Sequence, residues 1–450
     1  MSGAPPMPPR TVADLAASFG TPLYVYDLAA VRRAYHDLAD ALPAGARLHY
    51  SLKANPHPRL VAELARLGCW AEVSSVGELD MAVAEGMKPA QVQLTGPGKT
   101  DAAIARALSL GVTRFSVESP HDLARVGSLA SRHRSRADCL LRVNADGPVA
   151  GMGLAMSGRA SQFGADSSWI LRSPEEFAGS GGASVTGLHF YAGTNLADEG
   201  VLMRQFEDSI RLAARLLPLL PGATELNLGG GFGAPYAQTG ERQCFTGLAN
   251  GLTRLLDTYL PGWRHGSPAV GFESGRYLVA DSGTLVCRII DVKVSKGVTF
   301  VVIDAGVNQL GGMSGLRRLM PLQPVLLPLP PGPAADWEAS ARADKQSVSC
   351  CVVGPLCTPL DTLARGVPLA DPRPGGLLAI RNVGAYGLTA SLIAFLSHPL
   401  PAEVITDGLD VVDASRIHLC RSAVPGSRSP GSHAGDTNQG PPSMTSRAPS

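Results

Sequence analysis

The chain has 450 residues, 45% of them hydrophobic and 17% charged, so it can bury a large core and divide into two or three domains. Its 39 basic and 38 acidic side chains give a net charge of +1, which offers no electrostatic case for nucleic acid or an anionic membrane as a partner. The start contains prolines where a secretory signal needs an apolar run, and no segment approaches the ~20 apolar residues of a membrane span. We therefore expect a cytoplasmic protein. Its eight scattered cysteines, with no C-x-x-C pair, indicate neither a disulfide framework nor a zinc site.

Short apolar runs alternate with helical patterns from about residue 28 to residue 275. Eight of these runs are typical of buried parallel strands: RLHYSL (47–52), CWAEVSS (69–75), QVQLTG (91–96), RFSVES (114–119), CLLRVN (139–144), VTGLHFY (185–191), TELNLGG (224–230) and AVGFES (269–274). Separated by helices, they predict an α/β fold, a TIM (β/α)8 barrel over residues 28–275.

The pattern changes after Arg276 to longer strand-like segments with few helices, such as GTLVCRIIDVKVS (283–295) and GGLLAIRNVG (375–384). This change predicts a mainly antiparallel β domain over residues 276–420. Residues 1–27, which include PLYVYD, are expected to join that β domain. Residues 421–450 consist mostly of Ser, Pro, Gly and polar groups, which predicts a disordered tail.

A lysine, Lys53, follows the first predicted barrel strand in YSLKANPHPRL (50–60). Barrel enzymes place their chemistry at such strand ends, although a lone lysine there more often lies at the barrel rim as a solvated charge. A desolvated lysine amine can form a Schiff base with an aldehyde cofactor, which also needs a phosphate cradle and a partner for its pyridine nitrogen. LNLGGGFG supplies Gly229–Gly231, and GFESGRYL supplies Glu273 and Arg276. Singly, each could be an ordinary glycine turn or surface ion pair.

Jointly, seven motifs resemble the fold-type III pyridoxal-phosphate decarboxylases, the group of diaminopimelate and ornithine decarboxylases. They are YSLKANP, AEVSSVGEL, GLHFYAGT, LNLGGGFG, FESGRYL, GPLCTPLD and GAYG, and the resemblance extends from about Thr21 to Ile417. It implies an alanine-racemase-like barrel plus a C-terminal antiparallel β-barrel domain. It also implies pyridoxal 5′-phosphate at the barrel mouth and a homodimer with shared active sites.

The resemblance also assigns roles to individual residues. Lys53 would bind the cofactor covalently, Glu273 would hold its pyridine nitrogen, and Cys357, supplied by the neighbouring subunit, would return a proton to Cα. Without its motif, Cys357 would be interpreted as an inert core cysteine. Further cofactor contacts are implied for Glu72, Glu78, Arg142, His189, Tyr191, Thr194, Gly229, Gly230, Gly231, Arg276 and Tyr386. Substrate contacts are predicted for Arg276, Arg317, Arg318, Thr358, Asp361 and Tyr386.

The chain departs from the family pattern at two places, one in the cofactor site and one in the substrate site. Tyr191 replaces a histidine that stacks on the pyridine ring, and an aromatic face can still stack there. Thr358 and Pro359 follow Cys357 where the diamino-acid decarboxylases carry an acid for the distal ammonium, which counts against ornithine, lysine or diaminopimelate. With TGPGK (95–99) and QFG (162–164), these features resemble a branch that acts on amino acids tethered to an acyl carrier protein.

The leading hypothesis is α-decarboxylation of a glutamate- or aspartate-like amino acid tethered to an acyl carrier protein through its side-chain carboxyl, in secondary metabolism such as antibiotic biosynthesis. Arg317 and Arg318 could meet the leaving carboxylate or the acidic carrier, or form a solvated basic turn. One alternative is a decarboxylase of a free amino acid, most plausibly diaminopimelate. Another is a catalytically inactive homologue that binds the cofactor. An amino-acid racemase ranks below both because its second base would be a tyrosine outside any GPLC motif.

Overall fold

The computed structural model describes residues 12–145, 160–191, 193–311, 323–329 and 347–422. Contacts divide the chain into residues 1–417, which contain every element described below, and residues 418–450. Arg317, Arg318 and nearly all of the tail predicted to be disordered lie outside the described residues. Within those ranges, no helix is both long and apolar enough to cross a membrane.

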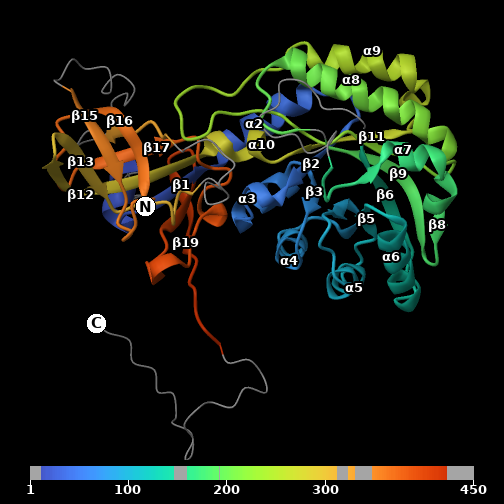
Figure 1. The fold of residues 1–450 in the computed structure, drawn as a ribbon, viewed down its shortest axis with the longest axis horizontal. Coiled ribbons are helices and arrows are strands. Elements are labelled where there is room, and N and C mark those ends of the chain that lie inside the picture. The colour runs from blue at the N-terminus through green and yellow to red at the C-terminus, as the bar shows by residue number, and fades with distance from the viewer. Residues whose placement is uncertain (1–11, 146–159, 192, 312–322, 330–346, 423–450) are drawn as a thin grey trace, which may run out of the picture. The chain divides into compact units, whose positions relative to one another are not determined.

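Eight parallel strands close into a barrel (Figure 1). Their order is β2 (Arg47–Ser51), β3 (Trp70–Val73), β4 (Val92–Leu94), β5 (Arg114–Val117), β6 (Ala137–Asn144), β9 (Ala183–Phe190), β10 (Glu225–Asn227) and β11 (Ala269–Ser274). Strand β11 pairs with β2 and completes the circle. The strands are apolar along their length because helices cover one face and the barrel core fills the other. All eight predicted strands are present, and the prediction of a TIM barrel is confirmed.

Helices link the barrel strands, and most of the longer ones begin at polar caps. The longer ones are α2 (Leu28–Asp40), α3 (Pro58–Arg66), α4 (Val76–Ala84), α5 (Asp101–Ser109), α6 (Pro120–Arg132), α8 (Glu199–Leu216) and α9 (Leu248–Tyr259); α7 (Ser167–Arg172) and α10 (Arg276–Val279) are short. The side chains of Ser75, Thr100, Ser119 and Asp198 each accept a backbone N–H of the following first turn. Such caps satisfy N–H groups that have no partner within the helix.

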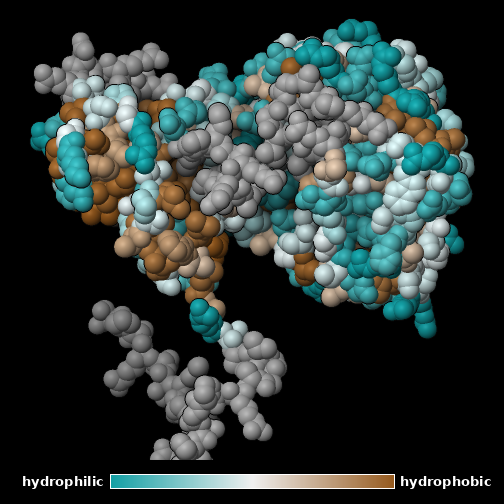
Figure 2. All heavy atoms as spheres, viewed as in Figure 1, coloured by the Kyte–Doolittle hydropathy of each residue, from teal (hydrophilic) through white to brown (hydrophobic). Residues whose placement is uncertain are grey.

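A second sheet has the order β16-β15-β13-β12-β1-β18-β19, and β17 pairs with β12 and β14. Its strands are β1 (Leu23–Asp27), β12 (Gly283–Ser295), β13 (Val298–Ile303), β14 (Leu327–Leu329), β15 (Ser347–Val353), β16 (Thr362–Ala370), β17 (Leu377–Arg381), β18 (Ala402–Asp407) and β19 (Asp410–Arg416). Most pairs are antiparallel, as predicted, but β1–β18 and β13–β15 are parallel. The direction of these pairs depends on long connections, which strand patterns do not specify. Apolar side chains are prominent over this sheet, whereas the barrel's helices show mainly hydrophilic ones (Figure 2).

The segment that follows β17 contacts the turn that follows β2. Tyr386 N donates a hydrogen bond to Ala54 O at 2.7 Å, and Asn55 Nδ2 donates one to Gly384 O at 2.9 Å. Tyr386 adopts a left-handed backbone conformation with φ of 54°, held further by Tyr236, whose hydroxyl donates to its carbonyl at 2.8 Å. These bonds bring a residue from the far end of the chain to the mouth of the barrel.

Candidate active site

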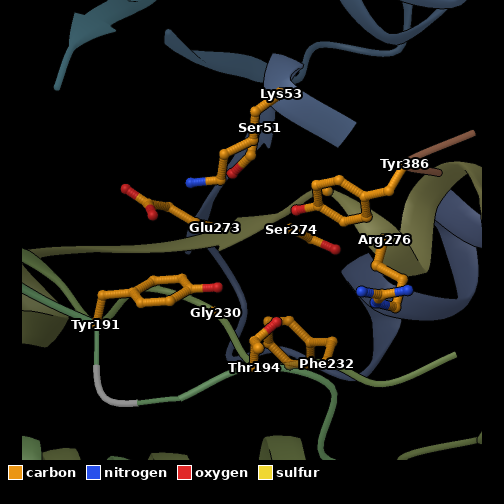
Figure 3. Close-up of a pocket in the computed structure, with 12 residues that line it drawn as sticks. Ser51, Lys53, Tyr191, Thr194, Gly230, Phe232, Glu273, Ser274, Arg276 and Tyr386 are labelled. Carbon is orange, nitrogen blue, oxygen red and sulfur yellow. The ribbon is translucent and has the colours of Figure 1, made fainter. Parts of the chain in front are cut away.

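A cavity lies where the carboxyl ends of the barrel strands meet. It is lined by Ser51, Lys53, Tyr191, Thr194, Gly230, Gly231, Phe232, Glu273, Ser274, Gly275, Arg276 and Tyr386. Figure 3 shows the Lys53 amine and the Glu273 carboxylate at one end and the Arg276 guanidinium at the other. The structure therefore gathers into one cavity eight of the residues predicted to contact the cofactor.

Lys53 reaches the cavity from the turn η1 (Leu52–Ala54), and its Nζ lies 3.2 and 3.4 Å from the two carboxylate oxygens of Glu72. The Glu72 side chain is only 4% exposed and also accepts a hydrogen bond from Thr95 Oγ1 at 2.5 Å. Desolvation disfavours the charged amine, but Glu72 together with Tyr191, Tyr386 and Glu273 outweighs it, so the pKa of Lys53 is raised. Burial likewise acts to raise the pKa of Glu72, but Lys53 and the hydrogen bonds lower it to about 2. At neutral pH the pair is an ammonium held by a carboxylate.

Glu273 is a buried carboxylate one residue before the end of β11. Asn227 Nδ2 donates a hydrogen bond to its Oε1 at 2.9 Å, and His189 Nε2 lies 3.1 Å from the same oxygen. Burial acts to raise the pKa of Glu273, but His189 and Lys53 together outweigh it, so the pKa is lowered. His189 is absent from the lining of the cavity and lies 2.7 Å from Ser116 Oγ through its Nδ1. His189 therefore supports Glu273, and its direct contact with the cofactor stays a prediction.

The glycine turn after β10 packs closely against β11. A Cβ on Gly230 would lie 2.3 Å from Glu273 O, and Gly229 and Gly231 have φ of +69° and +122°. Gly230 and Gly231 line the cavity, whereas Gly229 does not. Gly229 N donates a hydrogen bond to Asn227 Oδ1 at 2.9 Å, and Gly229 O accepts one from Glu273 N at 2.8 Å. Glycine is needed here for backbone conformation and close approach. The turn also presents backbone rather than side chains to a bound anion.

The other end of the cavity has polar groups suited to an anion. The Arg276 guanidinium lies 4.8 Å from the ring centroid of Tyr386 and 5.4 Å from that of Tyr236. Arg276 Nε and Ser274 Oγ are buried and have no hydrogen-bond partner among the described residues. Buried donors are normally paired, so these atoms indicate that a ligand completes the site. A guanidinium beside the hydroxyl of Thr194 is well suited to a phosphate, so the cavity fits a phosphorylated aldehyde cofactor.

Tyr191 forms an aromatic wall of the cavity. Lys53 Nζ lies 5.4 Å from the centroid of its ring, and the Arg142 guanidinium carbon lies 5.9 Å from it. Arg142 itself does not line the cavity; it lies 3.4 Å from Glu118 and 4.7 Å from the ring centroid of Phe163. Arg142 therefore lies beside Tyr191, which lines the cavity, and not in the lining itself.

Glu78, predicted to support the lysine and cofactor, acts at the start of α4. Its Oε2 accepts the N–H of Ser74 at 2.7 Å, while Ser75 Oγ accepts the N–H of Glu78 at 3.1 Å. This reciprocal cap orders the turn that directly follows Glu72 and β3.

Three predicted residues lie together on the loop between β15 and β16, and none of them lines the cavity of its own chain. Cys357 is exposed and Thr358 is half-buried. Asp361 is 2% exposed, and its two carboxylate oxygens accept backbone N–H groups of Val307 at 2.8 Å and Leu356 at 2.7 Å. Both oxygens of Asp361 therefore hold backbone N–H groups, and its contact with the substrate stays a prediction.

Sequence reasoning missed Ser51, Phe232, Ser274 and Gly275 in the lining, and Thr95 as a partner of Glu72. Their positions carried a signal. Ser51 and Ser274 are the last residues of β2 and β11, and Thr95 directly follows β4. Polar residues at the carboxyl ends of barrel strands face the active site.

A family model described as "Pyridoxal-dependent decarboxylase, pyridoxal binding domain" matches residues 28–280. The chain is 30% identical over 398 residues to the L-glutamyl-[BtrI acyl-carrier protein] decarboxylase of Niallia circulans, covering 88% of this chain and 90% of that protein. It is 32% identical over 404 residues to the diaminopimelate decarboxylase of Pseudomonas aeruginosa, with the same coverage of 88% and 90%.

A solved structure supports the same assignment. The diaminopimelate decarboxylase of Helicobacter pylori complexed with L-lysine matches with a TM-score of 0.76 and 25% identity, covering 90% of this chain and 95% of that one. The cavity that holds Lys53, Glu273 and Arg276 fits the cofactor of these enzymes. The chain therefore belongs to the family of pyridoxal-dependent decarboxylases, carboxy-lyases that use pyridoxal 5′-phosphate.

Proposed function

We propose that the protein removes the α-carboxylate of a glutamate- or aspartate-like amino acid held on an acyl carrier protein through its side-chain carboxyl. One observation carries this proposal. Among the described residues that line the cavity, Glu273 is the sole carboxylate, and it is bonded to Asn227 beside His189. A buried ammonium needs a carboxylate partner, whereas a thioester-linked side chain has no distal charge.

The loop that carries Cys357 has no free carboxylate beside the cysteine. Thr358 and Pro359 follow the cysteine, and the carboxylate of Asp361 is occupied by two backbone N–H groups. Neither the cavity nor this loop, as far as the structure describes them, offers a carboxylate to the distal ammonium of a diamino acid. The relative from Niallia circulans acts on a glutamyl group carried by an acyl carrier protein, which supports the same type of partner here.

The residues of the cavity divide the work between them. When bound, pyridoxal phosphate takes up the electron pair left at Cα as CO2 departs. In our proposal Lys53 attaches the cofactor and Glu72 holds the amine in place. Glu273, whose lowered pKa keeps it ionised, would hold the ring nitrogen of the cofactor. Arg276 and Thr194, together with Gly230, Gly231 and Tyr386, would hold its phosphate.

We infer that Cys357 acts in the cavity of a second copy of the chain. It is exposed and does not line its own cavity. Leu360, three residues further on, is 80% exposed, and Leu392 is 48% exposed. The two leucines belong to neighbouring segments, because Leu392 N donates to Val307 O at 3.5 Å and Val307 N donates to Asp361. Exposed leucines beside a thiol favour burial in a homodimer, where the thiol can return a proton to Cα.

The test measures CO2 release by the holoenzyme from glutamyl-carrier protein, aspartyl-carrier protein and free meso-diaminopimelate. We expect release from one of the two carrier-bound amino acids, and no release when the same amino acid is offered free. Release from free diaminopimelate alone would refute the tethered substrate and leave the decarboxylase assignment intact.

A second candidate is the decarboxylation of free diaminopimelate, which the 32% identity to the Pseudomonas aeruginosa enzyme favours. The same assay separates it from the first. A cofactor-binding homologue without activity would show the ~420 nm absorbance of a bound pyridoxal group but release no CO2 from any of the three substrates.

A further inference from the structure

The loop Gly354–Asp361 is closed at its base by one buried carboxylate. Asp361 Oδ1 accepts the N–H of Val307 at 2.8 Å, and Oδ2 accepts the N–H of Leu356 at 2.7 Å. The backbone closes the same ring, because Gly354 N donates to Asp361 O at 3.0 Å. Val307 lies outside the loop, after β13, so the carboxylate ties the loop to a neighbouring part of the sheet.

Two glycines make room for this carboxylate. A Cβ on Gly306 would lie 2.6 Å from Asp361 Oδ1, and a Cβ on Gly354 would lie 2.4 Å from Oδ2 and 2.5 Å from the Cα of Gly306. Any side chain at either glycine would displace the carboxylate or the backbone beside it. Asp361 itself is 2% exposed. The base of the loop is therefore closely packed around a single charged group.

The tip of the loop has the opposite character. Cys357, Pro359 and Leu360 are exposed. Within the tip, Thr358 N donates to Leu356 O at 2.8 Å, and Thr358 Oγ1 accepts the N–H of Leu360 at 3.3 Å. The thiol is one residue from Leu356, whose N–H is held by Asp361, so its position depends on that bond. Hydrogen bonds to a carboxylate are stronger than neutral ones and can hold a short loop against its conformational entropy.

We propose that Asp361 is a positioning residue: it fixes the loop so that the Cys357 thiol is presented to the active site of the second copy, and it does not bind substrate. The inference rests on the proposed role of Cys357. Asn at position 361 keeps the shape but turns one acceptor into an N–H2 donor that faces a backbone N–H. The Asp361→Asn variant therefore loosens the loop with little change in volume.

The first test does not depend on activity. In Asp361→Asn we expect the amides of Val307 and Leu356 to exchange hydrogen about tenfold faster or more, and the rate at which iodoacetamide alkylates Cys357 to change, both followed by peptide mass spectrometry. Asp27→Asn is the matched control, because Asp27 Oδ1 accepts the N–H of Ala29 at 2.9 Å at the end of β1, which β12 and β13 separate from β15 in the same sheet. Unchanged exchange at both amides in Asp361→Asn would overturn the proposal.

The second test asks whether the effect acts across subunits. With the substrate identified by the carrier-protein assay, we expect Asp361→Asn to lower kcat about tenfold or more at nearly constant KM, with the cofactor still bound. Mixing it with the inactive Lys53→Ala variant should restore about a quarter of wild-type activity, because half of the dimers then contain one intact site. An Asp361→Asn protein that binds cofactor but is not rescued by mixing would contradict the inference.

The Cys357→Ser variant distinguishes a failure of Cys357 as the proposed acid from a failure of Asp361 as its positioning residue. If Cys357→Ser turns over normally, the proposed acid is wrong. If Cys357→Ser is impaired and Asp361→Asn is not, only the positioning role of Asp361 fails.

Discussion

Replacing Glu403 by Gln should make the protein more stable at pH 8 and leave its stability unchanged at pH 4. Glu403 lies on β18, is 4% exposed, and accepts a hydrogen bond from the hydroxyl of Tyr26 at 3.1 Å. Desolvation raises the pKa of its carboxyl from 4.5 to about 7, although the Tyr26 bond acts to lower it. By linkage this rise corresponds to about 3 kcal/mol of folding free energy.

The sign of the effect follows from which state ionises first. Below pH 4.5 the Glu403 carboxyl is protonated in the folded and the unfolded chain, so it contributes no difference. Between pH 4.5 and about 7 the unfolded chain releases this proton before the folded one does, and stability is progressively lost. Above about pH 8 the wild-type protein bears the whole cost, about 3 kcal/mol, which a neutral amide avoids.

The measurement is the free energy of unfolding from urea titrations of the wild-type protein and Glu403→Gln at pH 4, 6 and 8. The gap between them should open from near zero to about 3 kcal/mol as the pH rises. The control is Glu207→Gln, which removes a partly exposed partner of Arg211 at 2.6 Å and should change stability by less than about 0.5 kcal/mol. A gap that is constant with pH, or a less stable Glu403→Gln protein at pH 8, would refute the reasoning.

Three further predictions concern the cavity. Glu72→Gln should lower the pKa of Lys53, because a carboxylate 3.2 Å away stabilises the ammonium by about 1 kcal/mol even at the dielectric constant of water. The pH dependence of Lys53 acetylation in cofactor-free protein should therefore shift by about one unit or more. Lys53→Ala should abolish the ~420 nm absorbance, whereas Lys88→Ala, an exposed lysine, should keep it. Gly230→Ala should weaken cofactor binding about tenfold or more in an absorbance titration, because its Cβ would lie 2.3 Å from Glu273 O; Gly98→Ala, with nothing within 4 Å, should not. An unchanged pH profile of Lys53 acetylation would contradict the first prediction, and a remaining absorbance band in Lys53→Ala would contradict the second. Equal cofactor affinities of Gly230→Ala and Gly98→Ala would contradict the third.

The barrel could be predicted because its strands are buried on both faces. Each therefore appears as an apolar run that ends at a polar residue, and the closed topology places all those ends at one rim. Lys53 follows β2 and Glu273 lies at the end of β11, two strands that pair in the structure. Local pattern and general topology were enough to bring these two side chains into one site.

The contact between His189 and Glu273 could not be predicted from the motifs GLHFYAGT and FESGRYL, to which they belong. His189 and Tyr191 stand two positions apart at the end of β9, yet Tyr191 lines the cavity and His189 lies 3.1 Å from a buried carboxylate. Which of the two side chains lines the cavity depends on where the strand ends and how the turn after it bends. A motif describes which residues are present, but the direction of each side chain depends on the surrounding packing.

The sequence by itself predicted the barrel from the periodicity of its strands, and it predicted the cofactor and the family from the resemblance of its motifs to those of pyridoxal-phosphate decarboxylases. Only the tertiary structure decided that Tyr386 N bonds to Ala54 O beside Lys53, that Asp361 accepts the N–H of Val307, and that His189 lies 3.1 Å from Glu273. Each of these depends on a contact between segments far apart in the chain. The partner of a buried polar group is chosen by its distance and direction in space, which no periodicity of the sequence encodes.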